Sequence, residues 1–374
     1  MIDIILLVIS ILSSAICGFI FIPLIMNFCK EKKLYDIPDK RKVHKKAIPR
    51  LGGISFLPSM LLAAVVAIIV LNQNIQRQAV TLSTWSIVFF FSLLLIYGIG
   101  IVDDLVGLGA KTKFCVQIIA ATILPLSGLY INNLYGFCGI HEIPFYIGSI
   151  LTVFTIVFAC NAINLIDGID GLSAGISLIA LTGFLVCFSR EGIIAYSILI
   201  AGLIGILIPF LYFNIFGKAE KNRKIFMGDS GSLTLGFILG FLFVKFTMDN
   251  PNVKHFRLES MMLAYSLLIV PSFDVVRVSL VRLCHKAHIF QADKNHIHHK
   301  LMRTGMNQHQ ALITILAITL VFILINLTLW YLIKINMSCV VIIDIVIWML
   351  LHWCINKAIT KKNLPVYMPN QEVA

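Results

Sequence analysis

Amides and carboxylates gather in the segment Asn161 to Gly175, which reads N-A-I-N-L-I-D-G-I-D-G-L-S-A-G. Asn161, Asn164 and Asp167 recur at i, i+3 and i+6, so on a helix their polar ends form one stripe. Asp170 follows between two glycines, where backbone can approach a ligand closely. A helix capped by Asn and Asp is the alternative without chemistry. Polar groups at the end of an apolar run are costly unless they are used, which favours a functional site.

A second acidic group, Asp103 and Asp104, ends another apolar run and is followed by Lys111 and Lys113. Adjacent carboxylates repel one another unless a cation, a proton or lysines compensate, which suits a divalent metal or a general base. A solvated helix end is the alternative. Lys113 begins the next apolar run, where a lysine can face a phosphate.

A third acidic position, Asp229, lies between glycines and hydroxyls in M-G-D-S-G-S. A carboxylate in this setting at a helix start can bind Mg²⁺ while nearby N–H groups face phosphate oxygens. Asp is also a good N-cap, which is the structural alternative. Aspartates in several loops on one predicted face are harder to attribute to capping than any one of them alone.

Histidines crowd the segment D-K-N-H-I-H-H-K, which contains His296, His298 and His299. A zinc site would lack a nearby cysteine, and the basic neighbours favour an anionic ligand such as pyrophosphate. In the preceding apolar run Asp274 and Arg277 stand at i and i+3, where we expect a structural ion pair.

A basic loop runs from Asp36 to Gly53 and ends in P-R-L-G-G. Its prolines stiffen it, and its cationic cluster, which includes His44 and Arg50, is predicted to attract a phosphate at a membrane surface. A simple stop-transfer loop would also be basic, but it would not need the Pro-Arg-x-Gly-Gly ending.

The elements that position these motifs must be membrane helices. Hydrophobic residues make up 59% of the 374 residues and charged residues 13%, and the mean hydropathy is +0.93, which excludes an ordinary soluble globular protein. We predict an all-α integral membrane protein, a single polytopic domain over residues 1–374, with a retained first helix rather than a cleaved signal peptide. About eleven transmembrane helices are expected, at roughly 3–29, 51–71, 83–102, 113–130, 145–163, 172–189, 193–213, 228–247, 259–281, 309–333 and 336–356.

Basic residues predict the orientation of these helices. Of the 30 Lys and Arg residues, 24 fall in or beside the same set of alternate loops, which places the N-terminus outside, the C-terminus in the cytoplasm and the active site in cytoplasmic loops. No nucleic-acid partner is expected, because no binding module accompanies the net charge of +12. The nine cysteines lack a C-x-x-C pattern and are interpreted as packing residues.

Taken in order, the motifs D-x-P-x-x-R-K-x-H, P-R-x-G-G, D-D, N-x-x-N-x-x-D-G-x-D-G-L, M-G-D-S-G-S and H-I-H-H resemble those of one family. It is the polyprenyl-phosphate N-acetylhexosamine-1-phosphate transferases (glycosyltransferase family 4), and within them the WecA/TagO-type branch; the resemblance covers nearly the whole chain. It implies a Mg²⁺-dependent enzyme of the bacterial inner membrane, with Mn²⁺ as an alternative ion. The enzyme would transfer a sugar-1-phosphate from a UDP-sugar to undecaprenyl phosphate, releasing UMP and forming an undecaprenyl-diphospho-sugar for a cell-envelope polysaccharide.

The resemblance also implies roles for individual residues. Asp229 and Asn164 would hold Mg²⁺. Asp103 would accept or orient the proton of the lipid phosphate, with Asp104 supporting it, while Asp167 belongs to the catalytic group without a fixed role. The phosphate-binding residues would be Lys113, Arg50 and His44, and the nucleotide-sugar contacts Asp170, which would read the uracil edge, Asn161, His296, His298 and His299. The expected partners are undecaprenyl phosphate, a UDP-N-acetylhexosamine, membrane lipid and, as one oligomeric state to test, a second copy in a homodimer.

Several alternatives stay open. H-I-H-H preceded by D-K-N favours GlcNAc over the muramoyl-pentapeptide branch, but another UDP-N-acetylhexosamine or UDP-MurNAc-pentapeptide would leave the reaction unchanged. Both a one-step displacement and a phospho-enzyme route fit the residues, and the polymer pathway is open. A transporter would place its acidic residues near mid-membrane and show repeated halves, and a non-catalytic scaffold would have no use for the aspartates. The D-G-x-x-A-R pattern of CDP-alcohol phosphotransferases is absent from the sequence.

Overall fold

Helices account for nearly all regular structure in the computed structural model, which describes residues 2–36, 47–72, 84–221, 223–249, 257–288 and 293–369. In chain order the elements are α1 (Ile2–Lys32), β1 (Tyr35–Asp36), β2 (Ile48–Pro49), η1 (Gly52–Ser55), α2 (Phe56–Asn72), α3 (Thr84–Val106), α4 (Ala110–Leu126), β3 (Asn133–Phe137), β4 (Ile140–Glu142), α5 (Phe145–Ile166), α6 (Leu172–Arg190), α7 (Ile194–Leu211), η2 (Tyr212–Phe216), η3 (Ala219–Lys221), α8 (Gly228–Thr247), α9 (Ser260–Leu267), α10 (Ile269–Cys284), α11 (Ile297–Arg303), α12 (Gln308–Thr328), η4 (Leu329–Ile333) and α13 (Met337–Thr360). The strands form two antiparallel pairs, β1–β2 and β3–β4, which the sequence did not lead us to expect.

The helices are those of a multi-pass membrane protein. Within the described residues, nine helices are long and apolar enough to cross a membrane, and they correspond to nine of the ranges expected from the sequence. The other two ranges are occupied by α4, which has 17 residues, and by the pair α9 and α10. Pro271 explains the break in that pair, because it has no N–H to donate to the carbonyl of Leu267. The count of eleven spans therefore stays a prediction.

Helix α8 forms the centre of the bundle, and every residue from Ser230 to Thr247 is buried. It is apolar on all sides, as expected of a helix enclosed by others. Its glycines let neighbours come close: a Cβ on Gly236 would lie 2.6 Å from the Cα of Cys160 in α5. A Cβ on Gly100 in α3 would lie 2.6 Å from the Cα of Ser230. These contacts fix α3 and α5 against α8.

The outer helices present apolar side chains outward. Ile4 in α1 is 67% exposed, Leu324 in α12 62% and Met349 in α13 65%. Such surfaces are stable against lipid, where only helices and closed barrels satisfy their backbone polar groups.

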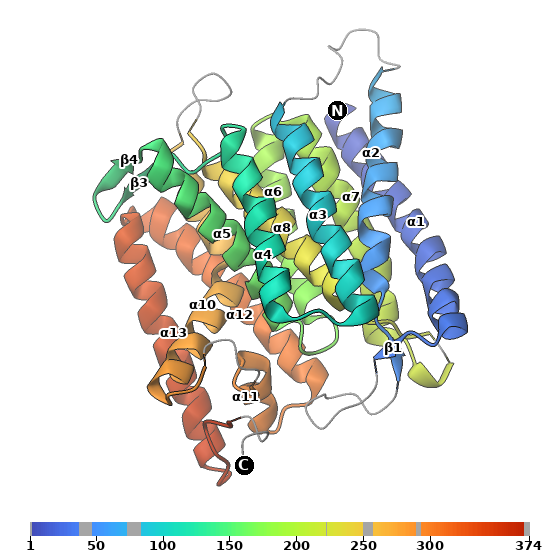
Figure 1. Ribbon diagram of the computed structural model, residues 1–374. Helices are drawn as coiled ribbons and strands as arrows, with labels where there is room; N and C mark the ends of the chain where they lie inside the picture. Colours follow the sequence, from blue (N-terminus) through green and yellow to red (C-terminus); the bar gives the residue numbers. More distant parts are fainter. Residues whose placement is uncertain are drawn as a thin grey trace.

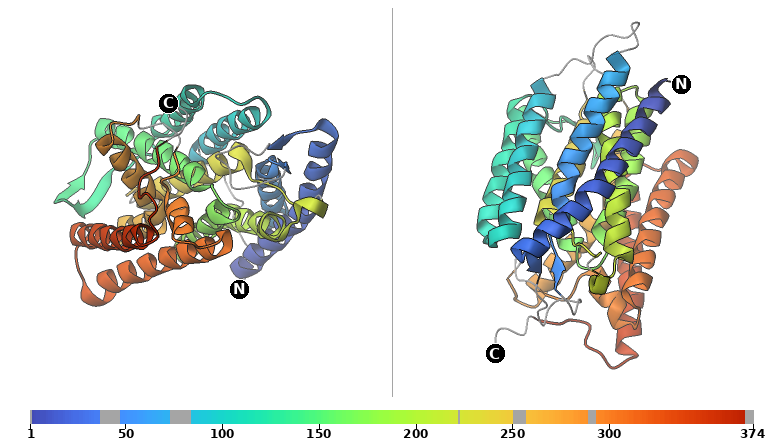
Figure 2. Two further views of the ribbon diagram at one scale, coloured as in Figure 1. Left: turned by 90° about the horizontal axis from the view of Figure 1, so that it is seen from below. Right: turned by 90° about the vertical axis from the view of Figure 1, so that its right-hand side faces the viewer.

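The segments that carry the sequence motifs lie at one end of the bundle (Figure 1). The last turns of α3 and α5, the first turn of α8, the β1–β2 pair and α11 all lie at the lower end in this view, and the β3–β4 pair lies at the other. Figure 2 shows the same bundle from below and from the side. Helix α1 begins at one end and α13 finishes at the opposite one, which agrees with an odd number of crossings.

Candidate active site

Lys113 bridges two of the predicted carboxylates. Its Nζ lies 2.6 Å from Oδ2 of Asp229 and 3.2 Å from Oδ2 of Asp103, so residues from α3, α4 and α8 meet at one ammonium group. The other oxygen of Asp103 accepts a hydrogen bond of 2.6 Å from the backbone N–H of Leu108. A single cation can therefore contact both carboxylates.

The amide of Asn164, at the end of α5, completes this cluster. Its Nδ2 donates to Oδ1 of Asp229 at 3.1 Å and to the hydroxyl of Ser232 at 2.8 Å. One turn earlier, Asn161 donates to Oε1 of Gln117 in α4 at 2.6 Å. Two residues of the expected stripe, Asn161 and Asn164, thus lie on α5, and their amides connect it to α4 and α8. The third, Asp167, is the C-cap residue, where the chain leaves the helix.

Asp104, a residue of α3, caps the N-terminus of the central helix α8. Its two oxygens accept the backbone N–H groups of Asp229 at 2.8 Å and Ser230 at 3.0 Å. The N-cap residue of α8, Met227, makes no side-chain capping bond. Asp104 therefore satisfies donors that a helix start leaves unpaired, and its negative charge suits the positive end of the helix dipole.

The Pro-Arg-x-Gly-Gly segment pairs with the chain that leads into α8. Phe226 N–H donates to the carbonyl of Pro49 at 2.7 Å, and Gly53 N–H donates to the carbonyl of Met227 at 2.8 Å. Glycine is required here, because a Cβ on Gly53 would lie 2.0 Å from the backbone nitrogen of Gly231. Arg50 lies within this pairing, with its carbonyl against Gly228. His44 lies outside the described residues.

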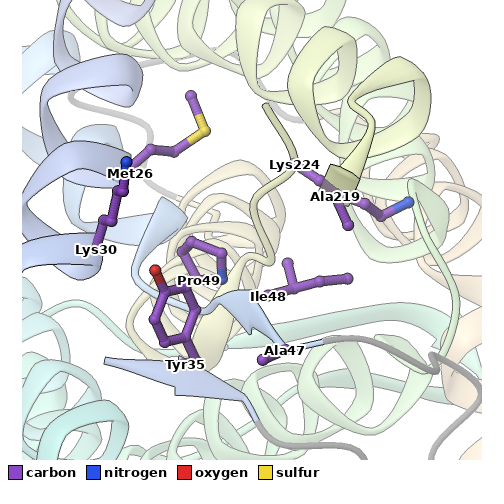
Figure 3. A pocket seen from close by; sticks show the side chains of 8 residues that line it. All are labelled: Met26, Lys30, Tyr35, Ala47, Ile48, Pro49, Ala219 and Lys224. Carbon is purple, nitrogen blue, oxygen red and sulfur yellow. The ribbon is translucent and has the colours of Figure 1, made fainter. Parts of the chain in front are cut away.

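Asp167 and Asp170 follow the stripe where the chain leaves α5. Burial, and then the nearby charges of Asp229 and Asp170, raise the pKa of Asp167 to about 8, so its neutral form predominates at pH 7. Asp170 forms an ion pair of 2.6 Å with Lys224. Lys224 also lines a cavity of about 20 Å³ beside the β1–β2 pair, room for about one water molecule. Figure 3 shows this cavity and its side chains.

The histidine motif packs against the same turn. A Cβ on Gly168 would lie 2.1 Å from Nε2 of His298, so the His298 ring rests directly on the Asp-Gly turn. The ring centroid of His298 lies 4.0 Å from that of His299 and 5.9 Å from that of His296. The histidine motif therefore lies against the turn that follows Asn161 and Asn164.

The three histidines differ in their surroundings. His296 Nδ1 lies 2.8 Å from Oδ2 of Asp274, whose other oxygen accepts from Arg277 at 2.8 Å and from the N–H of Ile297 at 3.0 Å. Burial lowers the pKa of His298 well below its usual range, and it lowers the pKa of His299 to about 4. His298 and His299 are therefore neutral at pH 7 and can offer N–H groups to an anion.

The donor set suits a hard divalent cation. Asp229 and Asp103 supply carboxylate oxygens, and because the amide nitrogen of Asn164 is already used, its carbonyl oxygen is the atom that can serve as a ligand. Within the described part of the chain, no three His, Cys, Asp or Glu side chains are grouped to hold a metal. A Mg²⁺ ion here would need water or substrate phosphates as further ligands, as Mg²⁺ often does.

Three residues with clear roles in the geometry were missed by sequence reasoning. Asn214, 4% exposed, accepts from the N–H of Gly171 at 2.6 Å and donates to the carbonyl of Ile225 at 2.8 Å, which joins two loops of the site. Lys224 is one of the 24 Lys and Arg residues from which the sequence predicts only the orientation, and for Asp274 the sequence predicts only the pair with Arg277. For Asn214 and Asp274, the available signal was an amide or carboxylate inside an apolar run; Lys224 had none beyond its charge.

Comparisons with known proteins identify the family of the chain. The model of glycosyl transferase family 4 matches residues 85–247, which include α3, α5 and the start of α8. A probable undecaprenyl-phosphate N-acetylglucosaminyl 1-phosphate transferase of Bacillus subtilis (strain 168) is 31% identical, over 84% of this chain and 83% of its own length. Undecaprenyl-phosphate alpha-N-acetylglucosaminyl 1-phosphate transferases of Yersinia pestis and Escherichia coli (strain K12) are each 28% identical, over 75% and 79% of this chain and 73% and 78% of their own lengths.

Proposed function

Because the chain belongs to glycosyl transferase family 4, we propose that it transfers N-acetylglucosamine 1-phosphate from UDP-GlcNAc to undecaprenyl phosphate. The products are UMP and undecaprenyl-diphospho-GlcNAc. The observation that carries the proposal is the convergence of Asp103, Lys113, Asn164 and Asp229 at one end of a membrane bundle. This arrangement lets an anionic lipid and an anionic nucleotide sugar meet at the membrane surface.

In the reaction an oxygen of the lipid phosphate attacks the phosphorus that bears the sugar. The bond from that phosphorus to the UMP oxygen breaks, and UMP leaves with the electron pair. Two anions approach each other in this step, so cationic groups must offset their repulsion and align the attacking and leaving oxygens. Lys113 supplies one positive charge. Asp103 orients the attacking oxygen or takes a remaining proton, although a phosphate monoester is already largely ionised near pH 7.

Asp229 and Asn164 hold Mg²⁺ in this proposal, with Mn²⁺ as an alternative. When bound, the ion neutralises charge on the diphosphate and fixes its geometry. Lys113, which bridges Asp103 and Asp229, would supply an ammonium group to a substrate phosphate if a cation took its place between the two carboxylates. Asp167 stays assigned to the catalytic group, without a fixed role.

The nucleotide sugar is held by the Asp-Gly turn after α5 and by the histidine motif. Asp170 accepts from the uracil N3–H, which requires its carboxylate to exchange Lys224 for the base. His296, His298 and His299 bind the diphosphate. Asn161 contacts the nucleotide sugar, and Arg50 binds phosphate.

We also propose the finer topology. The protein crosses the bacterial inner membrane eleven times, with the N-terminus outside, the C-terminus in the cytoplasm and the site on the cytoplasmic face. Residues 1–374 form a single membrane domain, and a homodimer is the oligomeric state to test. The excess of Lys and Arg on one set of loops supports this orientation.

Release of UMP by purified protein in detergent tests the function. The assay contains undecaprenyl phosphate, Mg²⁺ and one of UDP-GlcNAc, UDP-GalNAc or UDP-MurNAc-pentapeptide, with Asp229→Ala as a control. Lipid-dependent release with UDP-GlcNAc, abolished by a chelator and by the substitution, is expected. Release with only another UDP-sugar would overturn the choice of sugar, and no release by well-folded protein would overturn the reaction.

A further inference from the structure

The chain that follows α13 folds back onto the histidine loop. Met368 forms two hydrogen bonds with the side chain of Asn295: its carbonyl accepts from Nδ2 at 2.9 Å and its N–H donates to Oδ1 at 3.0 Å. Asn295 is only 2% exposed. An amide that pairs with both backbone groups of one residue fixes that residue in position as a neighbouring strand would.

Further contacts hold the same segment. Arg303, at the end of α11, donates to the carbonyls of Pro365 at 2.9 Å and Val366 at 3.0 Å. The ring of Tyr367 stacks on that of His285, with centroids 3.8 Å apart. Arg303 also donates to the carbonyl of Lys294 at 2.8 Å, so one guanidinium group joins the tail to the start of the histidine loop.

These contacts continue to the histidines. Asn295 immediately precedes His296, and its carbonyl accepts from Arg277 at 2.6 Å. Arg277 in turn pairs with Asp274, which holds both His296 and the first N–H of α11. The tail is therefore connected to His296 through the hydrogen-bonded side chains of Asn295, Arg277 and Asp274, of which Asn295 and Asp274 are buried.

We propose that residues 364–369 are a clasp that positions the histidine loop for the diphosphate of the nucleotide sugar, with Asn295 and Met368 as positioning residues. The proposal rests on the proposed function for the identity of the ligand. None of the clasp residues needs to touch substrate.

The physical reason lies in the short length of α11, whose position depends on contacts with other segments. Residues 293–305 lie between α10 and α12 at the end of the bundle, and α11 has only seven residues, too few to be stable without tertiary contacts. Without the clasp, the loop would spend part of its time in conformations that do not bind. The apparent affinity falls in proportion to the fraction that is competent, while saturating substrate restores the bound form.

A matched pair of variants tests the clasp. Met368→Pro removes the N–H that donates to Asn295, whereas Met368→Ala keeps the backbone intact. A chain ending at Asn363 removes the clasp entirely, and a chain ending at Pro369 keeps it. For Met368→Pro and the shorter chain we expect KM for UDP-GlcNAc to rise about tenfold, with kcat within about twofold and KM for undecaprenyl phosphate unchanged. Met368→Ala and the longer chain should match the unaltered protein.

A fall in kcat at unchanged KM, or equal behaviour of Met368→Pro and Met368→Ala, would overturn the clasp. If the chain ending at Asn363 does not fold, as judged by size-exclusion chromatography, the Met368 pair decides the question.

Hydrogen–deuterium exchange without substrate separates the clasp from the proposed function. Amides of residues 296–303 should exchange faster in Met368→Pro than in Met368→Ala, while those of α5 and α8 are unchanged. Equal exchange in the histidine loop would contradict the clasp even in an active enzyme. Faster exchange in a protein that releases no UMP would support the clasp while the proposed function fails.

Discussion

Lys113 occupies the position between two carboxylates where we propose that a divalent cation binds. Its ammonium group lies between Asp103 and Asp229, where it offsets the repulsion of two carboxylates. In Lys113→Gln that repulsion is relieved only by a bound cation, so Mg²⁺ should raise the thermal unfolding temperature of the variant more than that of the unaltered protein. UMP release should fall. Thermal unfolding in detergent with Mg²⁺ or with chelator measures the difference.

Lys111→Gln is the matched control, because Lys111 is exposed on the same helix. If Mg²⁺ raises the unfolding temperature of Lys113→Gln no more than that of the control, the metal does not bind between the two carboxylates that Lys113 bridges.

The neighbouring carboxylates Asp103 and Asp104 should respond differently to amidation. Asp104 accepts two backbone N–H groups of α8, and an asparagine would turn an NH₂ group toward one of them, at a cost of about 1–3 kcal/mol. Asp104→Asn should therefore lower both the unfolding temperature and activity. Asp103→Asn should keep the unfolding temperature and lower kcat by at least about 100-fold. Thermal unfolding and UMP release measured on the same samples test this, and equal losses of stability would refute the capping role of Asp104.

At this scale the sequence predicts which residues meet, but only part of what each does. Asp103, Asn164 and Asp229 were expected together because Asp103 and Asn164 end apolar runs and Asp229 begins one, all on one predicted face. The capping by Asp104 depends on the offset between α3 and α8, which no local pattern encodes. The pairing of Asp274 with His296 joins two elements across a turn, so a spacing of i and i+3 could reveal only its bond to Arg277.

Among the helices, the contact of α5 with α8 sets the geometry of the site. Gly236 allows it, because a Cβ there would lie 2.6 Å from Cys160 Cα and 2.9 Å from the carbonyl of Ala159. Gly236→Ala should force the helices apart, cost about 1–3 kcal/mol and shift Asn164 away from Asp229. Gly98→Ala in α3 meets nothing within 4 Å and should leave stability unchanged or slightly raised. Thermal unfolding and UMP release of the pair test this, and equal behaviour would contradict the close contact.

The short helix α11 should make stability depend on pH. Burial, followed by the charges of His296 and Arg303, lowers the pKa of His299 from 6.5 to about 4. Below pH 6.5 the unfolded chain takes up a proton that the folded chain rejects, so stability falls from pH 6.5 to about pH 4. In His299→Gln the unfolding temperature should depend less on pH over this range.

His309→Gln, at an exposed position in α12, is the control for this experiment. Unfolding temperatures measured at several pH values give the slopes. A slope in His299→Gln as steep as in the control would show that His299 titrates normally.

At the level of elements, apolar runs were sufficient to locate the helices because a membrane span must satisfy its own backbone. The sequence shows Pro271 inside an expected span, but the structure was needed to show that α9 ends at Leu267 and α10 begins at Ile269. The β1–β2 pair involves two residues in each strand, and a pairing this short leaves no periodic pattern in the sequence.

For the whole molecule, the predicted site residues that the structure describes lie at one end of the bundle. The acidic cluster, the Pro-Arg-x-Gly-Gly pairing and the histidine loop all lie at the lower end in Figure 1. The sequence predicts that this side carries most of the Lys and Arg residues. Cationic loops keep the protein in one orientation in the membrane, and they attract phosphorylated substrates to the same face. The same Lys and Arg residues therefore serve both purposes.

Natural cysteines test this orientation directly. Cys138 is exposed beside the β3–β4 pair, and Cys284 is exposed at the last residue of α10, toward the opposite end. Maleimides react with thiolates in water, so cysteines facing lipid should react slowly. In spheroplasts, a membrane-impermeant maleimide should label a variant that retains only Cys138 and spare one that retains only Cys284, while permeabilised cells should show both. Labelling of Cys284 in sealed spheroplasts would place the site outside the cell, where a cytoplasmic nucleotide sugar could not reach it, and would overturn the orientation and the proposed reaction together.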